Sequence, residues 1–292
     1  MRDHLLSLIK ADFPALDIRT SRLATNGWDN DVVIVNEEYV FRFATEPHTP
    51  LDVEMAVLNR LRDKTTLAIP HVEFIGRSAT YMGYRMIRGS QLTTPIYRAL
   101  SASQRTMLAR DLARFLVEVH RALSVQDAVS LGVRHENARS YLDEAMTVVH
   151  RIDNQNARSF VETTLRECEE IVAASGLESF LYNDLHGDNV GFDVERGCLN
   201  GVYDFGDIAI GDIHREFGPL YRLDKELLEA TVACYEQMTG VSLSLRRIVM
   251  IQRLDRLADL AMLFGDTGNP EVQKVFEEMN EWRNELDIYA QT

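Results

Sequence analysis

The segment at residues 180–207 constrains the chain most, because it combines three oxygen-bearing side chains with a pattern of short strands and turns. Asp184 is followed five residues later by Asn189, and an apolar strand, a polar turn and a second strand then lead to Asp204-Phe205-Gly206. A hairpin folds the chain back, so we expect Asp204 to approach Asn189. Taken singly, each residue could cap a turn, but the ordered set predicts one shared site.

These residue types suit phosphoryl transfer. The reaction needs an oxygen base beside the accepting hydroxyl and oxygen ligands for the Mg²⁺ that neutralises the phosphates. Asp184 suits the first role, and Asn189 and Asp204 suit the second. The sequence therefore predicts Asp184 as the catalytic residue and Asn189 and Asp204 as metal ligands.

The first ninety residues have the pattern of a small sheet with two helices. Residues 1–10 and 52–64 carry apolar faces at helical spacing, whereas residues 32–35, 39–43, 71–76 and 81–87 have strand patterns. Side chains alternate along a strand, so Phe41 and Phe43 share one face and Arg42 lies on the other. One face of this sheet can build core while the other faces a ligand.

Helical patterns dominate from Ser101 onward, where Ser101 and Gln104 form a capping-box signature. Further helical patterns cover residues 141–174, 225–238, 245–264 and 271–286. The sequence therefore predicts an α+β fold with a strand-rich front and a helical back.

Composition narrows the class of partner. Hydrophobic residues make up 46% of the 292 residues, which is enough for a substantial core. Lys and Arg total 31 against 45 Asp and Glu, and the formal charge of -14 repels nucleic acid and anionic membranes. An acidic surface attracts a polycationic small substrate, although acidity for solubility alone is the competing explanation.

Compartment is predicted from the cysteines and from hydropathy. Cys168, Cys198 and Cys234 cannot all pair within the chain, and they have no C-x-x-C spacing, so they are expected to be reduced packing residues. The first residues lack the unbroken apolar stretch of a signal peptide, and no segment has the length of a membrane helix. A cytoplasmic location is predicted.

With its motifs in view, the chain resembles the aminoglycoside phosphotransferase family of kinase-like small-molecule kinases over nearly its full length. NDLHGDN at residues 183–189 resembles the family's catalytic loop, and VYDFGD at residues 202–207 resembles its metal-binding segment. Within the family, the similarity is nearest to the 2″-phosphotransferases. The resemblance implies a bilobal protein-kinase-like fold, with a β-rich nucleotide-binding lobe at residues 1–87, a hinge at about 85–89, and a mainly helical catalytic and substrate-binding lobe at 88–292.

The resemblance also assigns the nucleotide site. Gly27 and Asn30 fall in the position of the nucleotide-covering loop, although this loop lacks the G-x-G-x-x-G pattern and also fits an ordinary turn. Backbone groups near Arg85 and Ile87 fall at the hinge that receives the nucleobase edge. The implied phosphoryl donor is ATP or GTP, with Mg²⁺ as cofactor.

Two departures from the family pattern concern this machinery. Arg42 stands where such kinases usually carry a phosphate-binding Lys, and Glu54 on the next predicted helix matches its ion-pair partner. Arg remains cationic and can bind phosphate with two donors. Tyr182 stands where the family usually has an architectural His, and Tyr can also donate a hydrogen bond. We interpret His186 as a residue that shapes the loop rather than as the base.

The acceptor implied by the resemblance is an aminoglycoside, and the implied role is antibiotic resistance. The chain lacks the long activation segment and Ala-Pro-Glu of a protein kinase, which favours a small molecule. A macrolide, a choline-like amine or a sugar metabolite are alternative acceptors, and a catalytically quiet nucleotide-binding sensor is the alternative of another class. Ammonium groups of the acceptor call for carboxylates. The candidates are Asp207, Asp224, Glu226, Asp255 and Asp259, followed by Glu277, Glu278 and Glu281.

Overall fold

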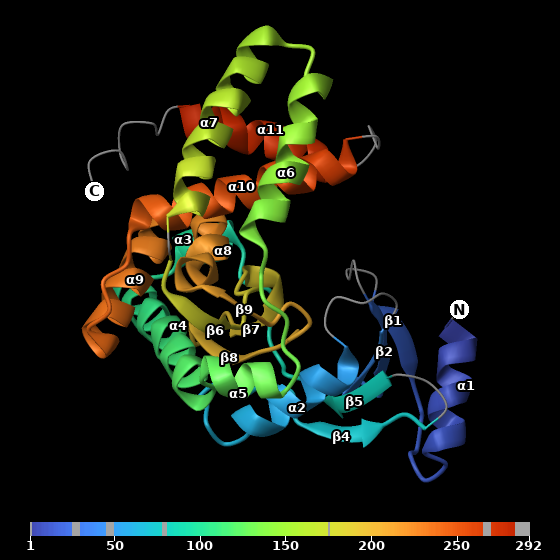
Figure 1. The fold of residues 1–292 in the computed structure, drawn as a ribbon. Coiled ribbons are helices and arrows are strands. Elements are labelled where there is room, and N and C mark those ends of the chain that lie inside the picture. Colours follow the sequence, from blue (N-terminus) through green and yellow to red (C-terminus); the bar gives the residue numbers. More distant parts are fainter. Residues whose placement is uncertain are drawn as a thin grey trace. The chain divides into compact units, whose positions relative to one another are not determined.

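A computed structural model of the chain describes residues 2–24, 30–44, 50–77, 81–174, 176–264 and 270–283 (Figure 1). The chain forms two compact units, one of residues 1–134 and 180–210 and the other of residues 135–179 and 211–292. The first unit contains an antiparallel sheet together with the segment at 180–207, and the second is mostly helical. The predicted α+β class is confirmed, while the lobe division at residues 87 and 88 stays a prediction.

The elements of the first unit begin with α1 (Arg2–Asp12), β1 (Ser21–Ala24), β2 (Asn30–Val35), β3 (Tyr39–Ala44), α2 (Leu51–Leu61), β4 (Val72–Ile75) and β5 (Tyr81–Arg85). They continue with α3 (Thr94–Ala99), α4 (Ala102–Ala122), α5 (Val125–Ser130), the 3₁₀ turn η2 (Gly187–Asn189), β7 (Val190–Asp193) and β8 (Cys198–Val202). Two strands, β6 (Glu178–Leu181) and β9 (Ala209–Asp212), pair with each other where the chain passes from one unit to the other.

The five-stranded sheet has the order β1-β2-β3-β5-β4 and follows the predicted alternation of faces. Phe41 and Phe43 are buried with Tyr81 in a core that α1 covers through Leu5 and Ile9. Arg42, between the two phenylalanines, therefore faces away from this core. The register sets its neighbours, because Arg42 pairs with Val32 on β2 and Met82 on β5.

The turn between β2 and β3 is tight. Asn36 and Glu37 both adopt left-handed backbone conformations, with φ of 56° and 52°. Such φ values match the twist of a hairpin and are tolerated best by Asn among non-glycine residues. The Asn36 side chain also accepts hydrogen bonds from the backbone N–H groups of Arg19 and Thr20 at 2.9 and 3.0 Å. The turn thereby fixes the register that positions Arg42.

Residues 85–92 run from β5 to the β7–β8 hairpin within the first unit. Ser90 and Phe192 exchange two backbone hydrogen bonds of 2.8 Å, and the N–H of Leu92 donates to the carbonyl of Gly187. Gly89 has a φ of 142°, and a Cβ atom there would collide with the backbone of Gly191. Only glycine allows the two backbone segments to lie this close together. The residues directly after the predicted hinge are therefore hydrogen-bonded to β7 and to the turn η2.

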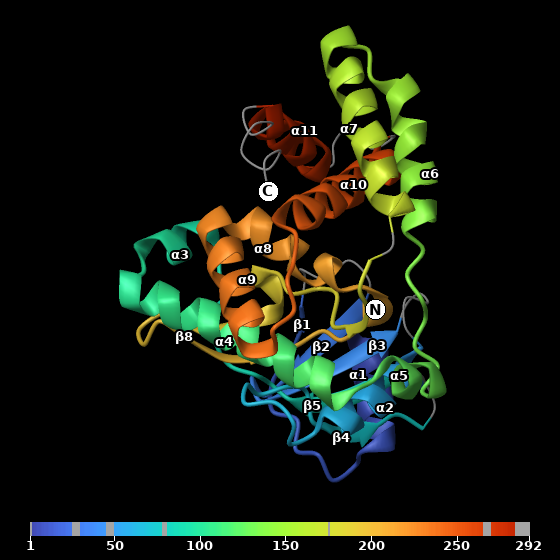
Figure 2. The ribbon, with the colours of Figure 1, turned by 60° about the vertical axis from the view of Figure 1, so that its left-hand side comes forward.

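The second unit consists of α6 (Ala138–Val148), η1 (Val149–Arg151), α7 (Gln155–Ala173), η3 (Ile213–Phe217), α8 (Gly218–Leu223), α9 (Lys225–Thr239), α10 (Leu245–Leu263) and α11 (Pro270–Arg283). Figures 1 and 2 both show α6 and α7 side by side, and α10 packs against each of them. Twelve side chains of α10 are buried, including those of Arg253 and Arg256.

The helical pattern predicted at 141–174 corresponds to two helices. The break falls at residues 152–154, because the Asn154 side chain accepts a hydrogen bond from the N–H of Ala157 and starts α7. The capping box at Ser101 and Gln104 is present as predicted. None of the helices that the structure describes is long and apolar enough to span a membrane.

Candidate active site

The loop after β6 holds the Asp184 carboxylate from two sides. The 3₁₀ turn η2 brings Asn189 back toward it, and the Asn189 Nδ2 donates to Asp184 Oδ2 at 2.5 Å and to the Asp184 carbonyl at 3.1 Å. His186 Nε2 lies 3.1 Å from Asp184 Oδ1. Because His186 Nδ1 accepts the N–H of Asp188, its proton belongs on Nε2, facing Asp184. His186 shapes the loop and orients the carboxylate.

Tyr182 connects this loop to the segment that carries Asp204. Its side chain is fully buried, and its hydroxyl donates to the carbonyl of Tyr203 at 2.5 Å. The ring packs edge-on against Phe205 at 4.8 Å between centroids. The N–H of Tyr203 in turn donates to the carbonyl of Asn189 at 2.9 Å. The residues on either side of Asp204 are therefore held by the catalytic loop.

Two residues of the site adopt strained backbone conformations. Asn183 and Asp204 have φ of 70° and 62°, in the left-handed region that L residues rarely occupy. Asn183 Nδ2 donates to the carbonyl of Asp207 at 3.0 Å, and the N–H of Gly206 donates to Asp204 Oδ1 at 3.3 Å. These bonds support the two conformations, and 41% of the Asp204 side chain stays exposed.

Arg42 bridges two carboxylates on the face of the sheet opposite the aromatic core. Its Nη1 donates to Oε2 of Glu54 on α2, and its Nη2 lies 3.1 Å from Asp204 Oδ1. Arg42 and Glu54 are almost completely buried, with 8% and 2% of their side chains exposed. The structure therefore brings together the predicted phosphate-binding cation, its predicted ion-pair partner and one predicted metal ligand.

Burial and charge act on this cluster in opposite directions. Burial alone would lower the pKa of Arg42, but the carboxylates of Glu54 and Asp204 outweigh it and raise that pKa, so Arg42 stays cationic. Burial raises the pKa of Glu54 to about 7, against the lowering effect of the Arg42 guanidinium. The guanidinium is the fixed charge of the cluster.

The other predicted nucleotide contacts are located as follows. Arg85 points its side chain to Glu38 and Glu73 at 2.7 and 3.2 Å, so only its backbone is relevant to a ligand. The N–H of Met86 donates to the Glu38 carbonyl, whereas the Ile87 backbone makes no hydrogen bond to any residue that the structure describes. Asn30 begins β2 opposite Ala44, and Gly27 lies outside the described residues.

Comparisons with known proteins place this geometry in a family. The profile of the phosphotransferase enzyme family matches residues 20–247. The chain belongs to the phosphotransferase enzyme family. Asp184, Asn189 and Asp204 all lie within the matched range.

Solved structures give the fold of this phosphotransferase. A GDP complex of a mutant aminoglycoside 2'-phosphotransferase-IIIa aligns with a TM-score of 0.86 at 22% identity, covering 99% of this chain and 100% of the other. The streptomycin–ATP complex of APH(2")-IIa aligns at 0.67 and 20%, covering 96% of each chain. Macrolide 2'-phosphotransferase MphH from Brachybacterium faecium aligns at 0.66 and 18%, covering 92% and 94%. The kinase-like fold is confirmed.

A phosphotransferase of this class implies a magnesium ion, and the donor set fits one. Asp204 offers a partly exposed anionic oxygen. The amide nitrogen of Asn189 is directed to Asp184, which leaves the amide oxygen as the ligand atom. Within the described ranges, no three His, Cys, Asp or Glu side chains gather into a metal cluster. Protein ligands of this number suit Mg²⁺ that is shared with nucleotide phosphates.

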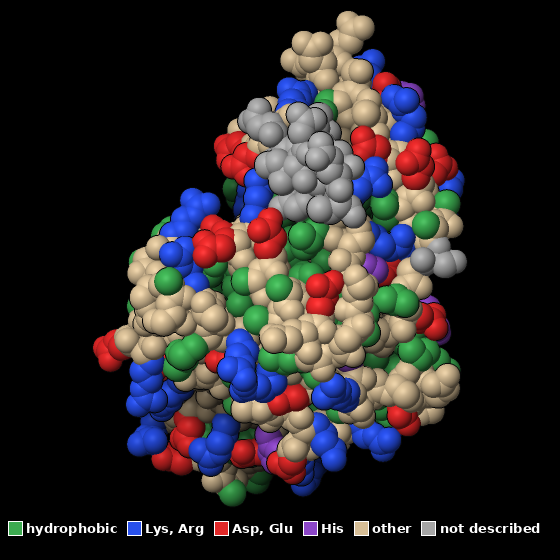
Figure 3. Space-filling view, turned by 90° about the vertical axis from the view of Figure 1, so that its left-hand side faces the viewer, with side chains coloured by type: hydrophobic (Ala, Val, Ile, Leu, Met, Phe, Trp, Pro, Cys, Tyr) green, Lys and Arg blue, Asp and Glu red, His purple; other side chains and the backbone are tan. Residues whose placement is uncertain are grey.

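The predicted acceptor carboxylates of the phosphotransferase are dispersed. Asp207 lies in the first unit, where Arg134 Nη2 is 3.6 Å from its Oδ1. The others belong to the second unit: Asp224 caps α9 by accepting the N–H of Glu226, Asp255 pairs with Arg215 at 2.9 Å, and Asp259 pairs with Arg256 at 2.8 Å. Figure 3 shows acidic and basic side chains interspersed on the face in view.

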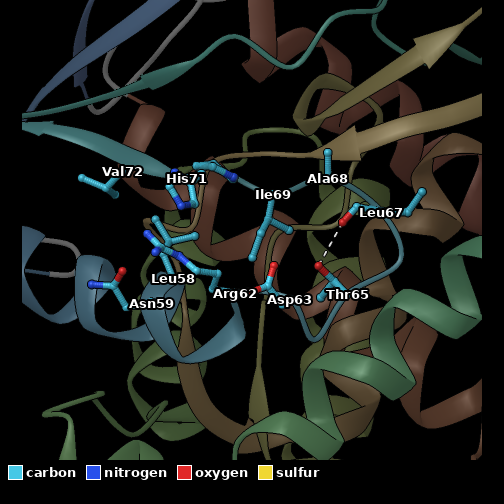
Figure 4. Close-up of a pocket in the computed structure, with 11 residues that line it drawn as sticks. Leu58, Asn59, Arg62, Asp63, Thr65, Leu67, Ala68, Ile69, His71 and Val72 are labelled. Carbon is cyan, nitrogen blue, oxygen red and sulfur yellow. Dashed lines mark hydrogen bonds between the residues drawn. The ribbon is translucent and has the colours of Figure 1, made fainter.

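A cavity of about 200 Å³ lies behind α2 in this phosphotransferase (Figure 4). Leu58, Arg62 and His71 line it together with the linker from α2 to β4. None of its lining residues is a predicted site residue. The linker that lines the cavity is bonded to β8, because the carbonyl of Ala68 accepts the N–H of Val202 at 2.8 Å. It is a feature of the scaffold of the first unit.

Sequence reasoning missed several residues that support the site. The support by Asn183 was missed, although Asn is the residue type that tolerates left-handed backbone best, and that preference was the available signal. The contact of Gly206 with Arg42 was also missed, because the residues lie far apart in sequence and meet only when the sheet is assembled. Tyr182 was noted as a donor, but nothing in the sequence identified the Tyr203 carbonyl as its acceptor.

Proposed function

We propose that the chain transfers the γ-phosphoryl group of ATP or GTP to a hydroxyl group of an aminoglycoside. The observation that carries the proposal is that Asn189 orients Asp184 through a hydrogen bond and is itself bonded to the segment of Asp204. The Asn189 carbonyl accepts the N–H of Tyr203, and the Asp204 carboxylate that follows is contacted by Arg42. A base, an oxygen ligand set and a phosphate-binding cation are the parts that phosphoryl transfer requires. All of them belong to the first unit.

Asp184 is the proposed base. Its two oxygens face Asn189 and His186, and 24% of its side chain is exposed. A carboxylate held in this way can orient the acceptor hydroxyl and take its proton as the oxygen attacks phosphorus. General-base assistance of this kind contributes about 10²- to 10⁴-fold to the rate.

The donor is proposed to bind through charge and backbone contacts. Arg42 is proposed to contact the phosphates, and the Ile87 backbone N–H and carbonyl, which bond to no described residue, are proposed to receive the nucleobase edge. Asn189 and Asp204 would hold Mg²⁺, which when bound neutralises charge on the phosphates. Gly27 and Asn30 are proposed to cover the phosphates, and Glu54 to position Arg42.

The acceptor is proposed to be cationic. Aminoglycosides carry several ammonium groups, and Asp207 is the last residue of the segment proposed to bind the metal. Its neighbour Arg134, at 3.6 Å, is 39% exposed, so a substrate ammonium could replace that weak contact. Asp224 and Glu226 remain proposed contacts, whereas Asp255 and Asp259 would first have to leave their arginine partners.

A macrolide is the second candidate acceptor, favoured by the similarity to macrolide 2'-phosphotransferase MphH at a TM-score of 0.66. A macrolide would contact apolar walls more than carboxylates. A choline-like amine and a sugar metabolite remain alternatives, as does a nucleotide-binding sensor. The location proposed is the cytoplasm, where ATP and GTP are supplied, and the three cysteines are free thiols.

The test is phosphate transfer to a panel of aminoglycosides, macrolides, choline and sugars with ATP and with GTP, read by product mass. We expect an aminoglycoside product, and we expect Asp184→Asn to lose it. Asp193→Asn is the matched control, because the Asp193 side chain contacts Arg196, whose N–H it accepts and whose Nε lies 3.7 Å away, and belongs to no predicted site. Aminoglycoside binding should weaken as salt rises, since screening acts over about 10 Å at 0.1 M. A macrolide product without an aminoglycoside product would show that the acceptor is a macrolide. Nucleotide binding without any product would favour the nucleotide-binding sensor.

A further inference from the structure

We propose that Arg42 makes metal binding at Asp204 conditional on the nucleotide. In this reading the enzyme is specific for a donor that brings metal and phosphates together, and it binds a free divalent cation weakly. The inference rests on the proposed function, because it takes Asp204 as a metal ligand. It adds a role for Arg42 that phosphate binding alone does not contain.

The first step is that Arg42 already neutralises Asp204. One guanidinium nitrogen is committed to Glu54, and the other lies 3.1 Å from Asp204 Oδ1. A planar guanidinium can bridge two carboxylates in this way because its donors diverge, and it does not lose its proton. A lysine at this position would offer a single compact ammonium. The arginine therefore holds each carboxylate with a separate nitrogen.

The second step is competition between two cations. A divalent ion at Asp204 would share that carboxylate with a guanidinium already at hydrogen-bonding distance, and the two positive charges repel. Arg42 cannot withdraw into solvent, because 8% of its side chain is exposed and Glu54 holds its other nitrogen. Without a nucleotide, a metal ion that binds Asp204 must break the contact between Arg42 and Asp204, and no phosphate oxygen replaces Asp204 as the acceptor.

The third step is release by phosphate. Phosphate oxygens accept hydrogen bonds from a guanidinium well, so a nucleotide offers Arg42 Nη2 an acceptor other than Asp204. The Asp204 carboxylate then turns to the metal. Linkage requires the reverse as well: metal at Asp204 strengthens nucleotide binding by the same factor. Metal and nucleotide are thus expected to bind as one cooperative unit.

Gly206 gives independent support to the contact. A Cβ atom at this position would fall on Arg42 Nη2 and would lie 3.2 Å from Asp204 Oδ1. The absence of a side chain at Gly206 is therefore what leaves room for the bridge. The backbone of Gly206 is outside the left-handed region, so alanine can adopt it. Gly206→Ala should move the guanidinium without changing any charge.

The experiment measures Mn²⁺ binding to the nucleotide-free protein by titration calorimetry. Arg42→Lys keeps a cation opposite Glu54, and we expect it to bind Mn²⁺ about tenfold more tightly than the wild type, within the usual range of coupling between sites. Gly206→Ala should change the affinity in the same direction. Arg22→Lys is the matched control, since Arg22 pairs with Glu37 on the same sheet and is exposed. It should leave Mn²⁺ affinity unchanged.

A second readout tests the coupling itself. The affinity for non-hydrolysable ATP and GTP analogues is compared in saturating Mn²⁺ and in EDTA, and the ratio should fall in Arg42→Lys by the factor gained in free Mn²⁺ binding. Equal Mn²⁺ affinity of folded wild type and Arg42→Lys would overturn the inference. If Asp204→Asn leaves the analogue affinity ratio of the wild type unchanged, the metal assignment itself fails, and the inference fails with it.

Discussion

Asp204 and Arg256 are both held in ion pairs, but their surroundings differ. Asp204 has a strained left-handed backbone and keeps 41% of its side chain exposed while Arg42 contacts one of its oxygens. Arg256 lies on the regular helix α10, is 4% exposed, and contacts Asp259 and Glu278 together at 2.8 and 2.9 Å. In both pairs the cation is buried and a carboxylate is partly exposed, because Asp259 on α10 keeps 39% of its side chain exposed. Backbone strain, rather than charge or exposure, therefore distinguishes the Asp204 carboxylate from the structural carboxylate of Asp259 on a regular helix.

The largest effect on the catalytic side is expected from Asp184→Ala. Removing the oriented base should lower single-turnover phosphate transfer by about 10²- to 10⁴-fold, while nucleotide affinity stays near that of the wild type. The measurement is single-turnover transfer beside nucleotide titration on folded protein. Near-normal transfer would exclude Asp184 as the base and would remove the catalytic half of the comparison.

The largest effect on the structural side is expected from Arg256→Met. The variant removes the Arg256 cation from Asp259 and Glu278 and leaves Glu278 with Arg222 at 3.8 Å, and loss of one partner of a buried pair costs about 3 kcal/mol of unfolding free energy. Arg139→Met is the matched control, because Arg139 also contacts two carboxylates but is 57% exposed. Its expected cost is under about 1 kcal/mol. Equal costs in urea unfolding would show that burial does not separate these pairs.

A smaller effect, on both stability and the Mg²⁺ requirement, is expected at Tyr182. Tyr182→Phe keeps the ring against Phe205 and removes only the hydrogen bond to the Tyr203 carbonyl. The lost bond should cost about 1 kcal/mol of stability. Because Tyr203 precedes Asp204, the Mg²⁺ concentration for half-maximal transfer should rise as well. Loss of stability with an unchanged Mg²⁺ requirement would limit Tyr182 to packing.

The smallest expected effect is on how stability depends on pH in the acid range, and it is expected at Asp212. Burial alone would raise the pKa of Asp212, but hydrogen bonds from His214 and Arg247 outweigh it and lower that pKa below the ordinary value. A depressed pKa adds stability above the unfolded value, and this stability is lost as pH falls through the folded one. Asp212→Asn should therefore lower stability at neutral pH and flatten the acid side of the profile. An unchanged acid slope would contradict this assignment.

Local patterns in the sequence were sufficient for much of the fold. Alternation predicted that Phe41 and Phe43 face a core and that Arg42 does not, because strand geometry leaves no other choice. Hairpin logic predicted that the segment after Asn189 returns toward it, and the bond from Tyr203 to the Asn189 carbonyl confirms this return. These predictions depend on neighbours within one or two elements.

Features with a weak local signal or with distant partners were not predicted. The break at residues 152–154 interrupts an apolar pattern that runs through it, and only the cap at Asn154 reveals it. The short helices α3, α5 and α8 were missed because six residues carry too little periodicity. Acidic residues on a predicted helix look alike in sequence, whereas in the structure Asp259 is paired with Arg256 at 2.8 Å.

The turn at Asn36 and Glu37 also limits how this chain can vary. It sets the register in which Val33 faces Phe41 and Val32 faces Arg42. Inserting or deleting one residue there would slip the strand by one position, and a slip of one exchanges the two faces of β3. Arg42 would then enter the aromatic core and Phe41 would replace it beside Glu54. Among related chains, this loop is therefore expected to vary in residue type far more freely than in length.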